Sequence, residues 1–189
     1  MELMESKFKD IDFKYLFSLE DKKNLELYFK MKNKHNLFLT EEEKTIFVKK
    51  IVACLKKIKF EYLVVPQSSN LILKEIATIL DPKFITIQKK DITKIIEYVE
   101  SMKLQKAQKQ KLMNDLKNNQ KVNNEIRMAS LAGNQREIIA EFLFEKLEFP
   151  NDVRVLCLDD SVFSGYSLYA ANTSIVSKDK EFICLFSQL

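Results

Sequence analysis

The sequence predicts an α/β protein with a mostly parallel central sheet and helices on both faces, preceded by a helical N-terminal segment. Short apolar runs rich in β-branched and aromatic residues recur at 60–65, 84–88, 153–158 and 182–186. The longer segments between them show the periodicity of amphipathic helices. This alternation is typical of βαβ units, whose parallel strands are buried on both faces.

Residues 1–59 are expected to form the helical segment. Thr40-Glu-Glu-Glu43 has the hydroxyl and carboxylate spacing of a capping box, and Ser18-Leu-Glu-Asp21 has the same spacing. Apolar residues then recur on one helix face, which predicts a second helix over about 41–58. This segment is expected to act as a hood, a cover for the sheet or a dimerisation unit.

Residues 60–189 are expected to form the α/β domain. Its first strand stops at Pro66, and Asp81-Pro82 ends the helix that follows. Asp91 begins a long basic helical insertion over about 91–127. The remaining elements are expected in this order: a helix at 71–80, a strand at 84–88, a helix from 92 to about 118, a helix opened by Asn134-Gln-Arg-Glu137 and reaching about 147, a strand at 153–158, a helix through Ala171 and a strand at 182–186.

Cysteine, histidine and glycine counts exclude several classes of site. Cys54, Cys157 and Cys184 are far apart in apolar runs, which favours buried, reduced thiols in a cytoplasmic protein and gives no zinc spacing. The single histidine, His35, excludes a site that needs two imidazoles. Two glycines are too few for a Rossmann or Walker phosphate loop. The sequence contains no run of eighteen apolar residues, so it predicts no membrane-spanning helix and no membrane partner is expected.

The net charge of +4 is clustered rather than spread evenly. Residues 101–127 carry six lysines and Arg127 against Asp115 and Glu125, which gives +5 in that stretch. This stretch is expected to be one of three things: a lid, a surface for a phosphate-rich partner, or a solvated face. It contains no aromatic residue, so a nucleic-acid partner is not expected. A homodimer or a partner protein is expected to use the helical segments 1–58 or 91–118.

The segment after the third predicted strand contains the main candidate site residues. Two adjacent carboxylates, Asp159 and Asp160, end an apolar run, and three serines and Gly165 follow within seven residues and lead into a helix. Hydroxyls and free backbone N–H groups at a helix start favour a phosphate dianion. The carboxylates would repel that phosphate, so they need ribose hydroxyls or a divalent metal as partners. A sugar phosphate provides both a phosphate for the hydroxyls and N–H groups and sugar hydroxyls for the carboxylates.

Residues 155–167, Val-Leu-Cys-Leu-Asp-Asp-Ser-Val-Phe-Ser-Gly-Tyr-Ser, resemble the phosphoribosyl pyrophosphate (PRPP) signature of the type I phosphoribosyltransferases. The resemblance implies that Asp159 and Asp160 are catalytic residues that hold the ribose hydroxyls, and that Asp160 accepts a proton from the nucleophile. It implies a ribose-phosphate site made by Ser161, Phe163, Ser164, Gly165, Tyr166 and Ser167.

The same resemblance implies a pyrophosphate site and a metal. The loop after the first core strand and the lysine pair after the second would contact pyrophosphate, and two arginines would reach the phosphates or the acceptor. Mg²⁺ would be held mainly by PRPP, with no direct protein ligand. The pyrophosphate residues are Gln67, Ser68, Ser69, Asn70, Lys89 and Lys90, and the arginines are Arg127 and Arg136.

Two functions follow from these expectations. The first is a Mg²⁺-dependent phosphoribosyltransferase that transfers a 5-phosphoribosyl group to an unknown acceptor and releases pyrophosphate. The alternative is a catalytically weak or inactive module of the same fold that binds PRPP or a nucleotide and acts through a protein partner. A helical adaptor whose basic 101–127 face contacts nucleic acid is the third interpretation and ranks last.

Overall fold

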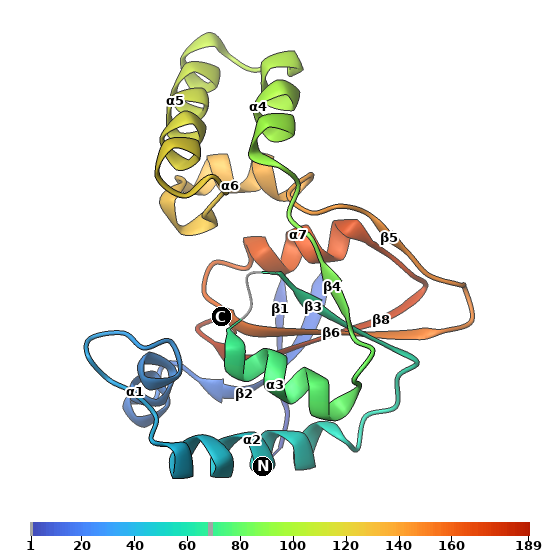
Figure 1. The fold of residues 1–189 in the computed structure, drawn as a ribbon. Helices are drawn as coiled ribbons and strands as arrows, with labels where there is room; N and C mark the ends of the chain where they lie inside the picture. Colours follow the sequence, from blue (N-terminus) through green and yellow to red (C-terminus); the bar gives the residue numbers. More distant parts are fainter. Residues whose placement is uncertain (1, 68–69) are drawn as a thin grey trace.

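The computed structural model describes residues 2–67 and 70–189, and they form an α/β fold around a mixed, mostly parallel sheet (Figure 1). The strand order is β1-β2-β8-β6-β3-β4. β1 pairs with β2 antiparallel, and every other neighbouring pair is parallel. The strands are β1 (Met4–Phe8), β2 (Ile11–Ser18), β3 (Tyr62–Pro66), β4 (Ile85–Ile87), β6 (Arg154–Val162) and β8 (Asp179–Ser187), and the short pair β5 (Leu147–Glu148) and β7 (Ile175–Val176) lies apart from them.

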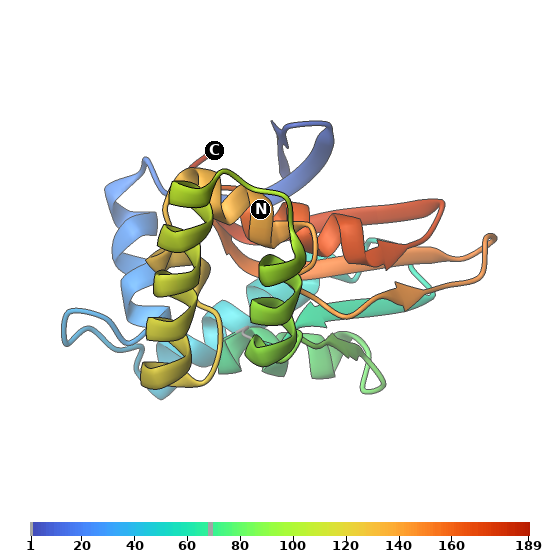
Figure 2. The ribbon, with the colours of Figure 1, turned by 90° about the horizontal axis from the view of Figure 1, so that it is seen from above.

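Helices cover both faces of this sheet, as predicted (Figures 1 and 2). Leu63, Leu156 and Leu158 on one face pack in one hydrophobic core with α1, α2 and α3. Val155 and Cys157 on the other face belong to a second core, with α7 and the helices that follow β4. The helices are α1 (Lys22–Met31), α2 (Glu41–Leu55), α3 (Leu71–Leu80), α4 (Ile92–Ser101), α5 (Lys106–Asn123), α6 (Gly133–Ala140) and α7 (Tyr166–Ser174), with the 3₁₀ turn η1 (Met128–Ser130).

The prediction that the chain begins with helix is wrong, because β1 and β2 come first. Ile11 and Phe13 are buried while Asp12 between them is exposed, which is the period-two pattern of a half-buried strand. β2 enters the main sheet beside β8, and Lys14 donates a hydrogen bond of 2.8 Å to Glu181. α1 begins later than predicted, capped by Asp21 rather than Ser18. The capping box at Thr40 is confirmed.

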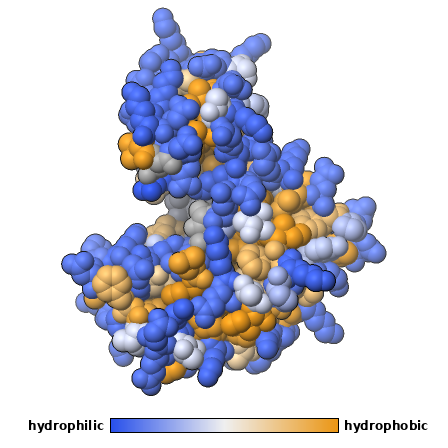
Figure 3. All heavy atoms as spheres, viewed as in Figure 1, coloured by the Kyte–Doolittle hydropathy of each residue, from blue (hydrophilic) through white to orange (hydrophobic). Residues whose placement is uncertain are grey.

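The helix predicted from 92 to about 118 is two helices, α4 and α5, which pack against each other. The chain leaves helical geometry at Met102, and Met102 and Leu104 both pack against the core, so burial of the connection ends α4. α4, α5 and α6 form a helical lobe on the α7 side of the sheet (Figures 1 and 2). The surface of this lobe over α4 and α5 is mostly hydrophilic in Figure 3.

The predicted helix reaching about 147 ends earlier, at Ala140. It also begins one residue before the predicted cap, with the Gln135 side chain accepting a hydrogen bond of 2.8 Å from Ala132 N. After it, Phe144 is buried and forms a β-bridge with Lys89, and Glu145 N donates to the carbonyl of Gln88. The segment is therefore extended because it pairs with the chain that leaves β4.

Candidate functional site

The two loops that carry the predicted site leave the sheet at the same place. β3 and β6 are neighbours, but the chain continues from β3 to β4 on one side and from β6 to β8 on the other. In open α/β sheets such a reversal of strand order leaves a crevice at the carboxyl ends of the strands, where ligands bind.

A cleft of about 440 Å³ lies at this point. Its walls come from four parts of the chain: the end of β6 with the turn into α7, the end of α1 with the turn after it, the end of β3, and the helical lobe with the segments that flank α6. Figure 3 shows the molecule hollowed between the lobe and the body below it. The residues that line the cleft are Tyr28, Lys32, Lys34, Pro66, Met128, Ala129, Arg136, Phe144, Asp159, Asp160, Ser161, Val162, Phe163, Ser164, Gly165, Ser167 and Leu168.

β6 continues past the two acidic residues to Val162, whereas the predicted strand stops at residue 158. Successive side chains of a strand point to opposite faces. Asp160 therefore follows Leu158 toward the α1–α3 face, and Asp159 follows Cys157 toward the α7 face. The adjacent carboxylates have different surroundings for this reason.

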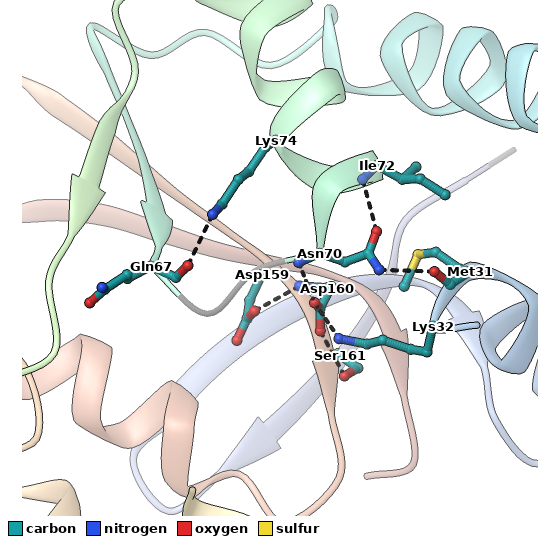
Figure 4. Close-up of polar contacts among 9 residues, drawn as sticks. All are labelled: Met31, Lys32, Gln67, Asn70, Ile72, Lys74, Asp159, Asp160 and Ser161. Carbon is teal, nitrogen blue, oxygen red and sulfur yellow. Dashed lines mark hydrogen bonds and ion pairs between the residues drawn. The ribbon is translucent and has the colours of Figure 1, made fainter. Parts of the chain in front are cut away.

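Asp160 is buried and fully engaged (Figure 4). Its Oδ2 accepts hydrogen bonds from Lys32 Nζ at 2.5 Å and from the backbone N of Asn70 at 3.0 Å. Its Oδ1 accepts from Ser161 Oγ at 2.9 Å. Asn70 in turn caps α3 by accepting from Ile72 N. Asp160 thus joins the end of α1, the start of α3 and β6.

The carboxylate of Asp159 accepts one hydrogen bond within residues 2–67 and 70–189. Its Oδ1 accepts a hydrogen bond from the backbone N of Asp160 at 2.7 Å. Burial and the charge of Asp160 raise the pKa of Asp159 to about 7, against the opposing effects of that hydrogen bond, Lys32 and Lys89. Asp159 is therefore able to exchange a proton near neutral pH.

The turn from β6 into α7 has backbone donors that no described residue pairs with. Gly165 has a φ of +72°, which directs the chain into the helix. The first hydrogen bond of the helix runs from Tyr169 N to the Gly165 carbonyl, and no acceptor within the described part of the chain meets the amides of residues 164–167. Ser164 and Ser167 line the cleft here, while Tyr166 does not and instead contacts Phe8 at 5.4 Å between ring centroids.

The end of α1 and the turn after it supply cleft residues that the sequence motif does not indicate. Lys32 and Lys34 lie near the Tyr28 ring, with their Nζ atoms 6.0 and 5.6 Å from its centroid. Burial raises the pKa of Tyr28, and the charge of Lys32 and the Ser161 side chain act in the opposite direction. Tyr28 and Lys32 are four residues apart, so helical periodicity places both on one face, but nothing local indicates what that face meets.

Of the residues predicted to contact pyrophosphate, the four that the structure describes, Gln67, Asn70, Lys89 and Lys90, all lie outside the cleft lining. Gln67 is exposed and outside the lining, and its side chain accepts from Lys89 N at 3.0 Å. Lys89 is close enough for its charge to lower the pKa of Asp159, yet its Nζ donates to the Ile126 carbonyl at 3.0 Å. Lys90 is held through its main chain, which donates to the carbonyl of Leu143. Ser68 and Ser69 lie outside the described residues.

Of the two predicted arginines, only Arg136 lines the cleft. Its Nε donates to the Leu131 carbonyl at 2.8 Å and its Nη2 to the Ala129 carbonyl at 3.4 Å, which orients the guanidinium. Arg127 is exposed and lies outside the lining. The lobe therefore contributes one cation to the cleft.

The donor set does not fit a directly bound Mg²⁺. Mg²⁺ requires oxygen ligands in near-octahedral geometry. Asp160 has both oxygens in hydrogen bonds, one of them to an ammonium group. Within residues 2–67 and 70–189, no group of three or more His, Cys, Asp or Glu is arranged to hold a metal ion.

Comparisons with protein-family models, with curated proteins and with solved structures find no match for this chain. In the described part of the chain, no helix has the length and apolar character needed to cross a membrane.

Proposed function

We propose that the cleft binds the 5-phosphoribosyl group of PRPP and that the chain is a phosphoribosyltransferase-like protein with an unknown acceptor. The observation that carries the proposal is the row of amides at 164–167, which have no acceptor among the described residues and lie at the N-terminus of α7 beside Asp159. Backbone N–H groups at a helix N-terminus favour a phosphate dianion. The 5-phosphate would lie there, with Ser164 and Ser167 as further donors.

The charges of the cleft suit the rest of this ligand. Lys34 and Arg136 line the cleft on the sides formed by α1 and the lobe, and would attract the pyrophosphate group. In the transfer, the bond between the anomeric carbon and pyrophosphate breaks and its electron pair leaves with pyrophosphate. A nitrogen of the acceptor forms the new bond to that carbon and loses a proton. Asp159, with a pKa of about 7, is the base we assign to that proton.

The alternative is a module that binds PRPP or a nucleotide without transfer. One observation favours it: Asp160 and Lys89, two groups expected to serve the ligand, are occupied by internal contacts with Lys32 and Ile126. A protein partner would then recognise the ligand-bound form of the module. Release of pyrophosphate in the presence of a panel of bases separates the two functions, because only the enzyme releases it.

The binding test uses Ser164→Asp. A carboxylate just before the N-terminus of α7 is favoured by the helix dipole, so the fold should be retained. The same carboxylate would repel a 5-phosphate. We expect PRPP and ribose 5-phosphate, but not ribose, to raise the melting temperature of the wild type, by the equivalent of about 2.7 kcal/mol at one hundred times Kd. Ser164→Asp should abolish this shift.

The matched control is Ser177→Asp, at a position after β7 and outside the cleft lining. This variant should keep the shift. Wild-type protein that shows no shift with millimolar PRPP or ribose 5-phosphate would refute both the enzyme and the binding module.

A further inference from the structure

The cleft contains a fixed cation that the sequence motif does not indicate. Lys32 is the residue that ends α1, where its backbone N donates to the Tyr28 carbonyl. Its Nζ lies 2.5 Å from Asp160 Oδ2, and the two side chains are 21% and 7% exposed. Figure 4 shows Lys32 reaching from α1 to the carboxylate at the end of β6.

Three features hold this ammonium in place. Asp160 is itself held by Asn70 N and Ser161 Oγ, so the carboxylate cannot rotate without losing both hydrogen bonds. Asn70 is tied to the same end of α1, because its Nδ2 donates to the Met31 carbonyl at 2.9 Å. Hydrogen bonds between ionised groups are shorter and stronger than neutral ones. These contacts fix the position of the Lys32 ammonium in the cleft wall.

A divalent cation and this ammonium compete for the same carboxylate. The ammonium occupies Asp160 Oδ2, and like charges so close in a partly buried site repel strongly. The ammonium also supplies what a metal would otherwise supply, a positive charge beside the negatively charged ligand. Lys34 and Arg136 add two further cations to the same cleft.

We propose that the Lys32 ammonium is the resident cation of this cleft and that the chain binds its phosphorylated sugar as a metal-free polyanion. This inference rests on the proposed function, since it concerns the form of the ligand taken by the same site. It differs from the expectation of a Mg²⁺–PRPP complex, and it assigns to Lys32 the role of a binding residue.

The experiment measures Kd by calorimetry for PRPP and for ribose 5-phosphate, once with EDTA and once with excess Mg²⁺. Wild-type Kd should be the same within about twofold in the two buffers. Lys32→Met keeps most of the apolar stem and removes the charge, so Kd with EDTA should rise about tenfold or more. Mg²⁺ should then restore much of the lost affinity, because the carboxylate is free to attract it.

Lys34→Met is the matched control. It removes a cation from the same wall, but no carboxylate in the described part of the chain pairs with Lys34, so Mg²⁺ should not restore its affinity. If Lys32→Met does not fold, the double variant Lys32→Met, Asp160→Asn removes both charges of the pair. This variant should bind weakly and equally in both buffers, while Lys32→Arg should keep the wild-type independence from metal.

The outcomes separate the two proposals. Wild-type binding that is lost in EDTA and regained with Mg²⁺ overturns the resident-cation inference and leaves the proposed function standing. Absence of binding to either compound in either buffer overturns the proposed function, and the inference with it. Equal affinity in both buffers, together with Mg²⁺ rescue of Lys32→Met, supports both.

Discussion

Gly165 lies where two constraints on a side chain coincide. Its φ of +72° is in the left-handed region that favours glycine. A Cβ at this position would lie 2.3 Å from the ring of Phe8, which belongs to β1. The turn that presents the free amides therefore needs glycine both for its own geometry and for the close approach of the N-terminal hairpin.

The chain has two glycines, so Gly133 provides a matched control for substitution by alanine. We expect Gly165→Ala to lower the free energy of unfolding by about 2 kcal/mol or more, from backbone strain and from the clash with Phe8. Gly133 begins α6, and a Cβ added there would have open space for 4 Å around it, so Gly133→Ala should be neutral or stabilising by up to about 1 kcal/mol. Urea unfolding measures both, and equal losses would contradict the explanation.

Asp159 gives the stability of the protein a defined pH dependence. Its folded pKa of about 7 lies above the unfolded value of about 4, so the folded state binds the extra proton between these pH values. The stabilising contribution is complete below about pH 4 and is lost as the pH rises through about 7, by up to about 1.4 kcal/mol per pH unit.

Asp159→Asn should remove this slope, because asparagine does not titrate and still accepts the hydrogen bond from Asp160 N. The variant should therefore gain stability over the wild type as the pH rises from about 4 to about 8, measured by urea unfolding at several pH values. Asp152→Asn, at an exposed position before the same strand, should follow the wild-type curve. A constant difference between Asp159→Asn and wild type would contradict a raised pKa.

At the scale of elements, a buried amide of the lobe, Asn119, supports one segment of the cleft wall. Asn119 of α5 is 5% exposed, and its Oδ1 accepts from Arg127 N at 3.2 Å and from Ser130 Oγ at 3.0 Å. Its Nδ2 donates to the Asp115 carbonyl. These contacts hold the segment that carries Met128 and Ala129 into the cleft wall.

Asn119→Ala should cost about 1 to 3 kcal/mol, because it leaves a backbone donor without its acceptor. We also expect weaker binding of ribose 5-phosphate, because the cleft wall at 128–129 loses its support. Asn118→Ala, exposed on the same helix, is the control and should change neither quantity by much. A stable Asn119→Ala variant with normal binding would show that the wall does not depend on this amide.

The elements that the sequence predicts well are those decided by local signals. The helix predicted at 71–80 is α3, Leu71–Leu80, because Asn70 caps its start and Asp81-Pro82 ends it. β1 and β2 are missed although their apolar and charged residues alternate as in a half-buried strand, whereas the pairing of β2 with the distant β8 is specified by no local pattern. The break between α4 and α5 depends on tertiary burial of Met102 and Leu104, which no local pattern specifies.

The candidate site also combines residues that local sequence indicates with residues that only the fold brings together. The segment 159–167 is recognisable because its residues are adjacent in sequence, and most of them line the cleft. The opposite orientations of Asp159 and Asp160 follow from the length of β6, which exceeds its apolar run. Tyr28, Lys32 and Lys34 come from the end of α1 and the turn after it, more than a hundred residues away, so only the folded chain brings them to the motif.

At the scale of the whole molecule, the sheet joins segments that are remote along the chain. β2 lies between β1 and β8, and the bonded residues Lys14 and Glu181 are 167 positions apart. Five parallel strands make such distant pairings unavoidable, and non-local pairing is a feature of slowly folding topologies.

This separation has a consequence during synthesis on the ribosome. The first hairpin emerges early, but one side of β2 stays without its neighbour until translation has reached β8. An open strand edge is a template for pairing with other chains, so the nascent polypeptide exposes an aggregation-prone edge from the synthesis of β2 until that of β8. The sheet is completed late, when β8, its final parallel strand, is inserted between β2 and β6.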